Sequence, residues 1–452
     1  MQKYLLKQIS IVNENKIEKK DIYLKNGRIE RIDNSIDVKE KVCEIIAEDK
    51  HLFPGVIDDQ VHFRDPGLTH KGTIYTESKA AIAGGVTSFM EMPNTIPNAL
   101  TIELLEEKYA NASKNSVANY SFYMGVSNTN AEEVLKVNKM KSVVCGVKIF
   151  MGSSTGNMLV DSEPALHRIF SESELLIATH CEDEKIITQN YRQLKSIKPV
   201  LEIFDHPVIR DENACFASSS FAISLAKKYN SRLHVLHIST EKELSLFENH
   251  LPIREKRITA EVCVHHLHFT ADDYEELGYL IKCNPAIKAA FNKDALWKAL
   301  LDDRLDVIAT DHAPHTLEEK LPPYEHAHAG LPLVQHPLLM MLSNFEKGKI
   351  SLEKIAEKMS HAVADCFTIK DRGYIREGYV ADLVMVNLKD KTTVSKENIL
   401  YKCGWSPLEG ETLPAKIEQV FVNGNLVYKN DYGKHWFDES VKGERLAFSN
   451  HR

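Results

Sequence analysis

The chain has 452 residues, 43% of them hydrophobic, with a formal net charge of −8 and a pI near 6.2. This length can bury a large core, and an acidic balance without a basic stripe argues against a nucleic-acid partner. No apolar run approaches the roughly 20 residues of a membrane span, and the N-terminus lacks a signal-peptide pattern. Eight cysteines are scattered without a CxxC pair. We therefore expect a cytoplasmic protein with reduced thiols, no membrane contact and no cysteine-bound zinc.

Both ends of the chain show short β-like runs separated by turn signals. Residues 21–29 contain the dipeptide Asn-Gly, which is a strong signal for a β-hairpin, and residues 421–428 contain another. We therefore expect residues 1–52 and 375–452 to pair into one small β-sandwich module that flanks a central domain.

The central domain begins with an apolar run that leads into a polar cluster and a Pro-Gly turn. Because side chains alternate along a strand, Asp58, Gln60 and His62 should face one way, and Asp59 should face the apolar helical layer. Three polar groups on one face of a buried strand are costly unless something binds them, and a metal ion is the obvious candidate. The alternative is an irregular loop with a hydrogen-bonded histidine.

Apolar β-like runs then alternate with helical segments, a rhythm that predicts βα units and a parallel sheet. The β-like runs are Leu52–Phe63, Gly85–Met92, Tyr120–Val126, Val143–Met151, Leu175–His180, Arg232–Ile238, Arg257–Val264 and Asp306–Thr310. Helical patches between them include residues 76–83, 102–112 and 214–228. Eight runs predict an α/β fold of the (β/α)8 type, a TIM-like barrel over residues 53–374.

Polar residues cluster at the ends of these strands, where barrels of this kind place their active sites. In chain order they are Gln60, His62, Arg64, Asn94, Lys148, His180, His237, Asp311 and His315. One histidine at a strand end is usually structural. Histidines at three strand ends together with an aspartate at a fourth are hard to explain by packing alone.

Lys148 lies within an apolar strand run, where burial of a charged amine is costly and lowers the pKa. The neutral amine can add carbon dioxide and become a carbamate that bridges two cations. From this position alone, a lysine that reaches the surface with its charged end is the better interpretation.

The pattern Pro-Gly-x-Ile-Asp-x-Gln-x-His-x-Arg-x-Pro-Gly over residues 54–67 resembles the motif of the cyclic amidohydrolases, and its arginine resembles that of the dihydroorotases. Gly-Val-Lys-Ile-Phe, residues 146–150, is similar to the segment that carries their carbamylated lysine. The resemblance covers nearly the whole chain and favours the carbamate for Lys148. It departs at Gln60, where the family has its first metal-binding histidine.

The resemblance implies one or two zinc ions as cofactor. His180 and His237 would hold one ion, His62 and Asp311 the other, and a carbamylated Lys148 would bridge them. A shared hydroxide would attack the ring amide, and Asp311 would carry its proton to the leaving nitrogen.

The implied reaction is the interconversion of N-carbamoyl-L-aspartate and (S)-dihydroorotate in de novo pyrimidine biosynthesis. The substrate would be held by Arg64, Asn94, His315 and Asn284. The only implied partners are this small molecule and a second copy in a homodimer.

Several features leave alternatives open. At Gln60, an amide oxygen is a weaker zinc ligand than imidazole, so we expect the ion on that side to bind more weakly. The tract His265-His266-Leu267-His268 is expected to be structural, because its members would alternate faces along a strand. Residues 316–336 are expected to form a mobile cover near the substrate.

Two other functions remain possible from the sequence. One is a dihydropyrimidinase-, hydantoinase- or allantoinase-like enzyme, whose substrates lack the ring carboxylate that Arg64 would bind. The other is a non-catalytic partner protein with the same fold, which only Gln60 supports.

Overall fold

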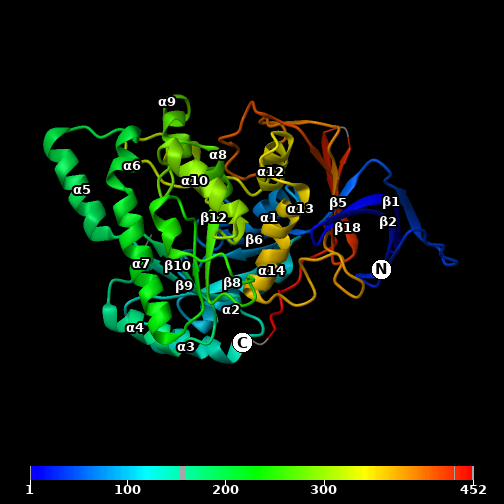
Figure 1. Cartoon of the computed structure of the whole chain (residues 1–452), viewed down its shortest axis with the longest axis horizontal. Helices are drawn as coiled ribbons and strands as arrows, with labels where there is room; N and C mark the ends of the chain where they lie inside the picture. Colours follow the sequence, from blue (N-terminus) through cyan, green and yellow to red (C-terminus); the bar gives the residue numbers. More distant parts are fainter. Residues whose placement is uncertain (1, 153–157, 432, 450–452) are drawn as a thin grey trace.

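Residues 2–152, 158–431 and 433–449 are described by a computed structural model, which contains two large β-sheets (Figure 1). One sheet curls into the barrel, and the other, built from the blue and red ends of the chain, lies beside it. No helix among these residues has both the length and the apolar character that a membrane span requires.

The barrel contains eight parallel strands in sequence order, as predicted. They are β6 (Val56–Val61), β7 (Val86–Glu91), β8 (Asn119–Gly125), β9 (Gly146–Met151), β10 (Ile177–Cys181), β11 (Leu233–Val235), β12 (Ile258–Cys263) and β13 (Val307–Ala309). The first and last strands meet just beyond their ends, where the backbone N–H of His62 donates to the carbonyl of His312 at 2.7 Å. This contact nearly closes the barrel.

Helices surround the barrel and confirm the predicted segments. After the first four strands come α1 (Ile74–Ala83), α2 (Ile102–Asn115), α3 (Ala131–Leu135) and α4 (Glu163–Glu172). Next are α5 (Glu184–Ile197), α6 (His206–Ile209), α7 (Glu212–Tyr229), α8 (Val264–His268), α9 (Tyr274–Leu277) and α10 (Ala290–Leu301). The last are α11 (Leu317–Lys320), α12 (Pro337–Glu346), α13 (Leu352–Ala356) and α14 (Ala362–Phe367). After β11 only a short 3-10 segment, Lys242–Leu246, takes the place of a helix.

The second sheet joins the two chain ends, as expected. Its strands are β1 (Tyr4–Asn13), β2 (Lys16–Lys25), β3 (Arg28–Asp33), β4 (Cys43–Ile46), β5 (His51–Pro54), β14 (Leu383–Asn387), β17 (Lys416–Val422), β18 (Asn425–Asp431) and β19 (Lys434–Phe437). The antiparallel pair β5–β14 connects the N-terminal strands to the C-terminal ones. A separate pair, β15 (Thr392–Thr393) and β16 (Thr412–Leu413), lies outside both sheets.

Both Asn-Gly dipeptides form the predicted hairpin turns. Asn26 and Gly27 have φ angles of 52° and 80°, and Asn423 and Gly424 have 50° and 71°. Positive φ at both central residues is the geometry that a two-residue hairpin between twisted strands requires. The two turns also touch, because a Cβ added at Gly424 would lie 2.6 Å from the Cα of Gly27.

The first predicted strand, Leu52–Phe63, is divided between the two sheets. Residues up to Pro54 belong to β5 in the terminal sheet, and residues from Val56 belong to β6 in the barrel. Gly55 lies between them, and a Cβ added there would lie 2.0 Å from the Oγ1 of Thr87. Only glycine allows this close approach, so the chain passes from one sheet to the other at this position.

The expected alternation along the first barrel strand is wrong at Asp59. The pairing of β6 with β7 is irregular between Asp58 and Val61, and such a bulge changes which side chains share a face. The carboxylate of Asp59 therefore lies 3.0 Å from Nε2 of the fully buried His234 on β11, while Asp58 bonds to Thr310 instead. Asp59 thus faces another barrel strand and has a charged partner there.

The C-terminal segment crosses the barrel on its way to the end of the chain. Leu446 and Phe448 are buried in the same apolar cluster as Tyr123 and Phe367. The backbone of Leu446 donates to the carbonyl of Tyr120 at 2.9 Å. Because Tyr120 lies at the start of β8, this segment covers the end of the barrel opposite the strands' carboxyl ends.

Candidate active site

The five side chains predicted to hold metal lie at the carboxyl ends of the barrel strands, and all are buried. They are His62 after β6, Lys148 in β9, His180 in β10, His237 after β11 and Asp311 after β13. Nε2 of His62 lies 3.1 Å from Oδ1 of Asp311, and Nδ1 of His180 lies 2.9 Å from Nε2 of His237. Lys148 is near both pairs. Burial and His180 lower the pKa of His237, and the charge of Lys148 lowers it further. Burial raises the pKa of Asp311, whereas the charges of the nearby histidines and of Lys148 lower it.

His62 has the orientation of a metal ligand. Its Nδ1 lies 2.7 Å from Oδ1 of Asn94, and in the neutral tautomer whose N–H donates to this amide oxygen, Nε2 is unprotonated and able to bind a cation. Burial lowers the pKa of His62, which favours this neutral form. Its Nε2 lone pair then faces the carboxylate of Asp311, an arrangement that a cation between the two groups would stabilise. Gln60 donates to the same Asp311 oxygen from Nε2 at 3.0 Å, and its Oε1 has no hydrogen-bond partner among the described residues.

His180 shows the same pattern on the other side of the site. Its Nε2 lies 2.9 Å from Oε2 of Glu182, which can only accept, so Nδ1 is left unprotonated and faces His237. Burial alone would raise the pKa of Glu182, but Arg210 and His180 lower it to about 2. A carboxylate that orients a histidine in this way is the usual support of a metal-binding imidazole. Both pairs therefore fit a divalent metal.

Lys148 is 1% exposed, and its Nζ lies 4.6 Å from the ring centroid of Phe150. No hydrogen bond or ion pair to Nζ is found among the described residues. Burial lowers the pKa of Lys148 to about 7, against smaller opposing effects of Asp311 and Glu261. A large fraction of the amine is therefore neutral near pH 7, the form that reacts with carbon dioxide.

The backbone is strained at three of these strand ends. Arg64, His237 and Asp311 have φ angles of 67°, 38° and 46°. Positive φ is uncommon for residues other than glycine, costs on the order of 1–3 kcal/mol each and clusters at functional sites. The sequence carries no signal for this strain, which the structure adds as independent support for a site here.

Arg64 and His315, both predicted to bind substrate, are neighbours in a cationic patch. Nη2 of Arg64 lies 3.0 Å from Nε2 of His315, and Nζ of Lys71 lies 3.1 Å from its Nδ1. Burial and these two cations hold the pKa of His315 well below its usual range, so the ring is neutral. Glu319 lies 3.0 Å from Lys71, and Asp311 and Glu91 also act on Arg64. The guanidinium of Arg64 and the ammonium of Lys71 are both charged donors that suit an anionic substrate group.

The remaining predicted substrate residues occupy different places. Asn94 orients His62, as described above, and is half-buried. Asn284 lines a cavity of about 400 Å³ together with Arg210, Lys282 and Tyr324. Because Arg210 also contacts Glu182, this cavity adjoins the His180 side of the site.

Sequence reasoning missed three supporting residues. Lys71, Glu182 and Arg210 are buried and charged, and each contacts a predicted site residue or its partner. Glu182 could have been found, since it follows His180 at the strand end. Lys71 and Arg210 lie in polar loop segments where nothing in the local pattern distinguishes them.

In the loop over residues 316–336, Lys320 holds the loop together and connects it to the segment that follows β12. This lysine is fully buried, and its Nζ donates to the carbonyls of Lys282, His328 and Gly330 at 2.9–3.0 Å. Three such bonds fix the path of the loop beside His315.

Comparison with known proteins agrees with this geometry. The model of the amidohydrolase family matches residues 51–427. A dihydroorotase of Methanosphaera stadtmanae is 31% identical over 422 residues, covering 92% of this chain and 95% of the relative. An allantoinase of Desulfitobacterium hafniense is 30% identical over 437 residues, covering 94% and 95%. The structure of an L-hydantoinase (dihydropyrimidinase) from Arthrobacter aurescens superposes with a TM-score of 0.89 at 27% identity, covering 99% of this chain and 98% of that one.

Proposed function

The chain belongs to the amidohydrolase family, and we propose that it is a zinc-dependent dihydroorotase that interconverts N-carbamoyl-L-aspartate and (S)-dihydroorotate in de novo pyrimidine biosynthesis. Its dihydroorotase and hydantoinase relatives make it a cyclic amide hydrolase. The observation that carries the choice of substrate is the buried patch of Arg64 and Lys71 around His315, next to Asp311. Dihydroorotate has a ring carboxylate that this patch can bind, whereas hydantoin and dihydrouracil have none.

His62, Lys148, His180, His237 and Asp311 would hold the metal, with Gln60 offering an amide oxygen. Bound there, zinc would polarise the amide carbonyl and lower the pKa of water. Lys148 would contribute as a carbamate: its neutral Nζ forms a bond to the carbon of CO₂ and releases one proton. The two carbamate oxygens would then replace a single nitrogen donor.

Asp311 would move the proton. Burial alone would raise the pKa of Asp311, but His62, His265 and Lys148 lower it, so the carboxylate is ionised and can accept a proton from water. As the water oxygen bonds to the ring carbonyl carbon, the carbon–nitrogen bond breaks and Asp311 returns the proton to the leaving nitrogen. Ring closure follows the same steps in reverse. Arg64 binds the substrate carboxylate through two parallel hydrogen bonds and thereby orients the ring.

The test compares turnover of dihydroorotate, dihydrouracil, hydantoin and allantoin, with zinc content measured on the same sample. We expect Arg64→Ala to lower kcat/KM for dihydroorotate on the order of 10²–10⁴-fold, the loss of two charged hydrogen bonds, with zinc content unchanged. Arg64→Lys is the matched control: it keeps the charge but loses the planar fork, so its loss should be partial. Loss of zinc in Arg64→Ala would contradict the assigned role.

An allantoinase or hydantoinase activity is the second candidate, because relatives with those names are nearly as similar. Turnover of allantoin or hydantoin without turnover of dihydroorotate would favour it. In that case Arg64→Ala should have little effect on the preferred substrate.

A further inference from the structure

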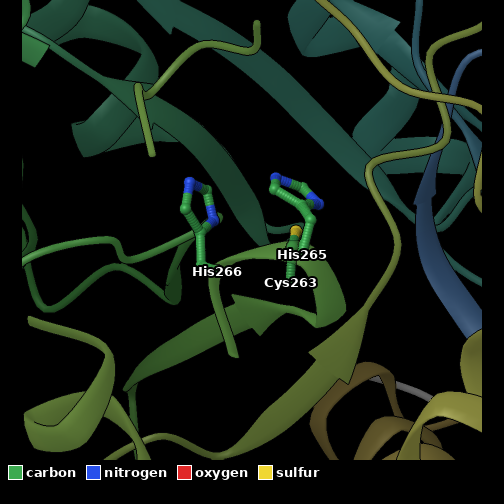
Figure 2. Close-up of side chains that lie close together, drawn as sticks. All are labelled: Cys263, His265 and His266. Atoms are coloured by element: carbon green, nitrogen blue, oxygen red, sulfur yellow. The ribbon is translucent and has the colours of Figure 1, made fainter. Parts of the chain in front are cut away.

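A second group of possible metal ligands lies where the seventh barrel strand ends. Strand β12 ends at Cys263, and the short helix α8 begins at the next residue. The expectation that the histidines which follow alternate along a strand is therefore wrong. Helical turning brings one donor atom each of Cys263, His265 and His266 to within 4.8 Å of one another. Figure 2 shows both imidazole rings on the same side of the turn, with the sulfur close to His265.

The ring nitrogens of these histidines are short of partners. Nε2 of His266 lies 3.1 Å from the carbonyl oxygen of Pro285, so it carries the proton and donates. Its Nδ1 is then a lone pair, and it has no hydrogen-bond partner among the described residues. A histidine with one nitrogen bonded to a backbone carbonyl and the other free is oriented as a metal ligand. His266 is only 4% exposed, so water does not readily satisfy that nitrogen.

His265 is buried even more deeply, at 1% exposure, and neither of its nitrogens has a hydrogen-bond partner of good geometry in the described part of the chain. Burial lowers the pKa of His265 to about 4, against smaller effects of Asp311 and the Thr310 carbonyl. The ring is therefore neutral and keeps one lone pair. An unbonded imidazole in a protein interior is costly unless something binds it.

Carboxylates lie beside two of the three ligands, while the cation Lys288 acts on His266. The thiol of Cys263 lies 3.3 Å from the carboxylate of Glu261, and Asp311 is near His265. One thiolate and two neutral imidazoles leave a bound divalent ion with a net positive charge, which these carboxylates would offset. Ideal ligands of a tetrahedral zinc are about 3.4–3.7 Å apart, from bond lengths of about 2.0–2.3 Å, so small side-chain rotations suffice.

We propose that Cys263, His265 and His266 form a further metal site, for zinc or another borderline-soft divalent ion, distinct from the centre assigned to Lys148 and its neighbours. On binding, the sulfur–hydrogen bond breaks, a sulfur–metal bond forms and the proton leaves to solvent. Three protein ligands leave a fourth position open for water or a small ligand, as in exchangeable rather than structural zinc sites. This proposal departs from the expectation of no cysteine-bound zinc, which rested on the scattered cysteines and the lack of a CxxC pair.

Sulfur makes the proposal testable independently of the proposed enzymatic activity, since the other assigned ligands are nitrogen and oxygen atoms. The protein is stripped with a chelator and titrated with Co²⁺ while its near-ultraviolet absorption is recorded. We expect a thiolate-to-cobalt charge-transfer band in the wild type that is absent in Cys263→Ser. His266→Ala should weaken Co²⁺ binding at this site at least tenfold.

Cys145→Ser is the matched control, because Cys145 is a buried thiol just before β9, at the opposite end of the barrel. It should keep the band. X-ray absorption of the zinc-loaded wild type needs no variant and should show sulfur at about 2.3 Å from zinc. Absence of a sulfur neighbour, or a cobalt band that survives Cys263→Ser, would overturn the proposal even if dihydroorotate is turned over normally.

Discussion

At the scale of single residues, Gln60 decides how firmly the proposed centre holds its second ion. It stands where the family motif has a histidine, and its Nε2 is bonded to Asp311 while its Oε1 is free of hydrogen bonds to described residues. An amide oxygen binds zinc more weakly than an imidazole nitrogen. Since His180 and His237 already face each other at 2.9 Å, the ion on their side should bind first.

We therefore expect the wild type to retain less than a full complement of two ions after mild chelation, and Gln60→His to retain both. Zinc per chain, measured after dialysis against a weak chelator, checks this. Gln193→His adds an imidazole on exposed helix α5 and controls for unspecific binding. Two ions held equally tightly in the wild type would contradict the argument.

Asp59 gives a second prediction, concerning stability and pH. Burial acts to lower the pKa of His234, but Cys366, Asp59 and Glu261 together raise it well above its usual value. Carboxylate oxygens of Asp59 and Glu261 lie 3.0 Å and 3.9 Å from Nε2 of His234. Because this pKa is raised in the folded state, the stabilisation is complete below the ordinary histidine pKa and is lost as pH rises through the folded-state value.

Asp59→Asn removes one partner of a buried ion pair, and we expect a loss of about 3–5 kcal/mol in the free energy of unfolding near pH 6. The loss should shrink as the pH rises through the raised folded-state pKa of His234, where the wild-type pair itself weakens. Denaturant unfolding over a series of pH values measures it. Asp58→Asn is the matched control. Asp58 accepts from the backbone N–H and the hydroxyl of Thr310; in the variant the amide oxygen can still accept from the N–H, and the amide nitrogen can donate to the hydroxyl. An equal loss in both variants would show that His234 is not the relevant partner.

These residues also show what sequence reasoning could and could not find. His62, His180, His237 and Asp311 were predicted to share one site because strand ends of a parallel barrel meet at one mouth, and the structure brings them together. Asp59 could not be placed, since the irregular pairing of β6 depends on β7, far along the chain. The close approach of Cys263, His265 and His266 could not be predicted either, because a helix and not a strand begins at Val264.

At the scale of elements, local turn chemistry predicted well and long-range junctions did not. Asn-Gly fixes a hairpin through the positive φ of both residues, so both hairpins were found. The apolar run over residues 52–63 gives no sign that it serves two sheets, because both of its halves are buried. The point where the chain passes from one sheet to the other is Gly55, and its close packing against the side chain of Thr87 is seen only in the structure.

Because the two hairpin turns touch, we expect a substitution in one turn to lower the free energy of unfolding of the protein. In Gly424→Ala, the new Cβ would combine a left-handed φ of 71° with a 2.6 Å approach to Gly27. We expect a loss on the order of 2–4 kcal/mol, the sum of backbone strain and overpacking.

Gly404→Ala is the matched control, with a φ of 74° and open space around the added atom. It should lose about 1–2 kcal/mol from the left-handed backbone alone. Thermal unfolding of both variants separates the two terms. Equal losses would mean that the turns do not hold the two chain ends together.

At the scale of the whole molecule, the two ends of the barrel are lined by different kinds of residues. Polar side chains from strand ends occupy one mouth, and the C-terminal segment closes the other with Leu446 and Phe448. Gly443 passes so close to the start of β8 that an added Cβ would lie 1.8 Å from the carbonyl oxygen of Ala118. Leu446 and Phe448 are therefore part of the barrel core, although they lie beyond the terminal sheet in sequence.

This arrangement predicts that a change near the C-terminus loosens the barrel itself. Leu446→Ala empties a fully buried position, and we expect it to cost about 2–5 kcal/mol. Hydrogen exchange should then accelerate at backbone amides of β8, because Leu446 and Tyr120 are hydrogen-bonded neighbours. Lys442→Ala, at an exposed position in the same segment, should change neither quantity. Faster exchange confined to residues 443–449 would instead mean that the segment lies on the barrel without supporting it, and that the eight strands hold their closed form alone.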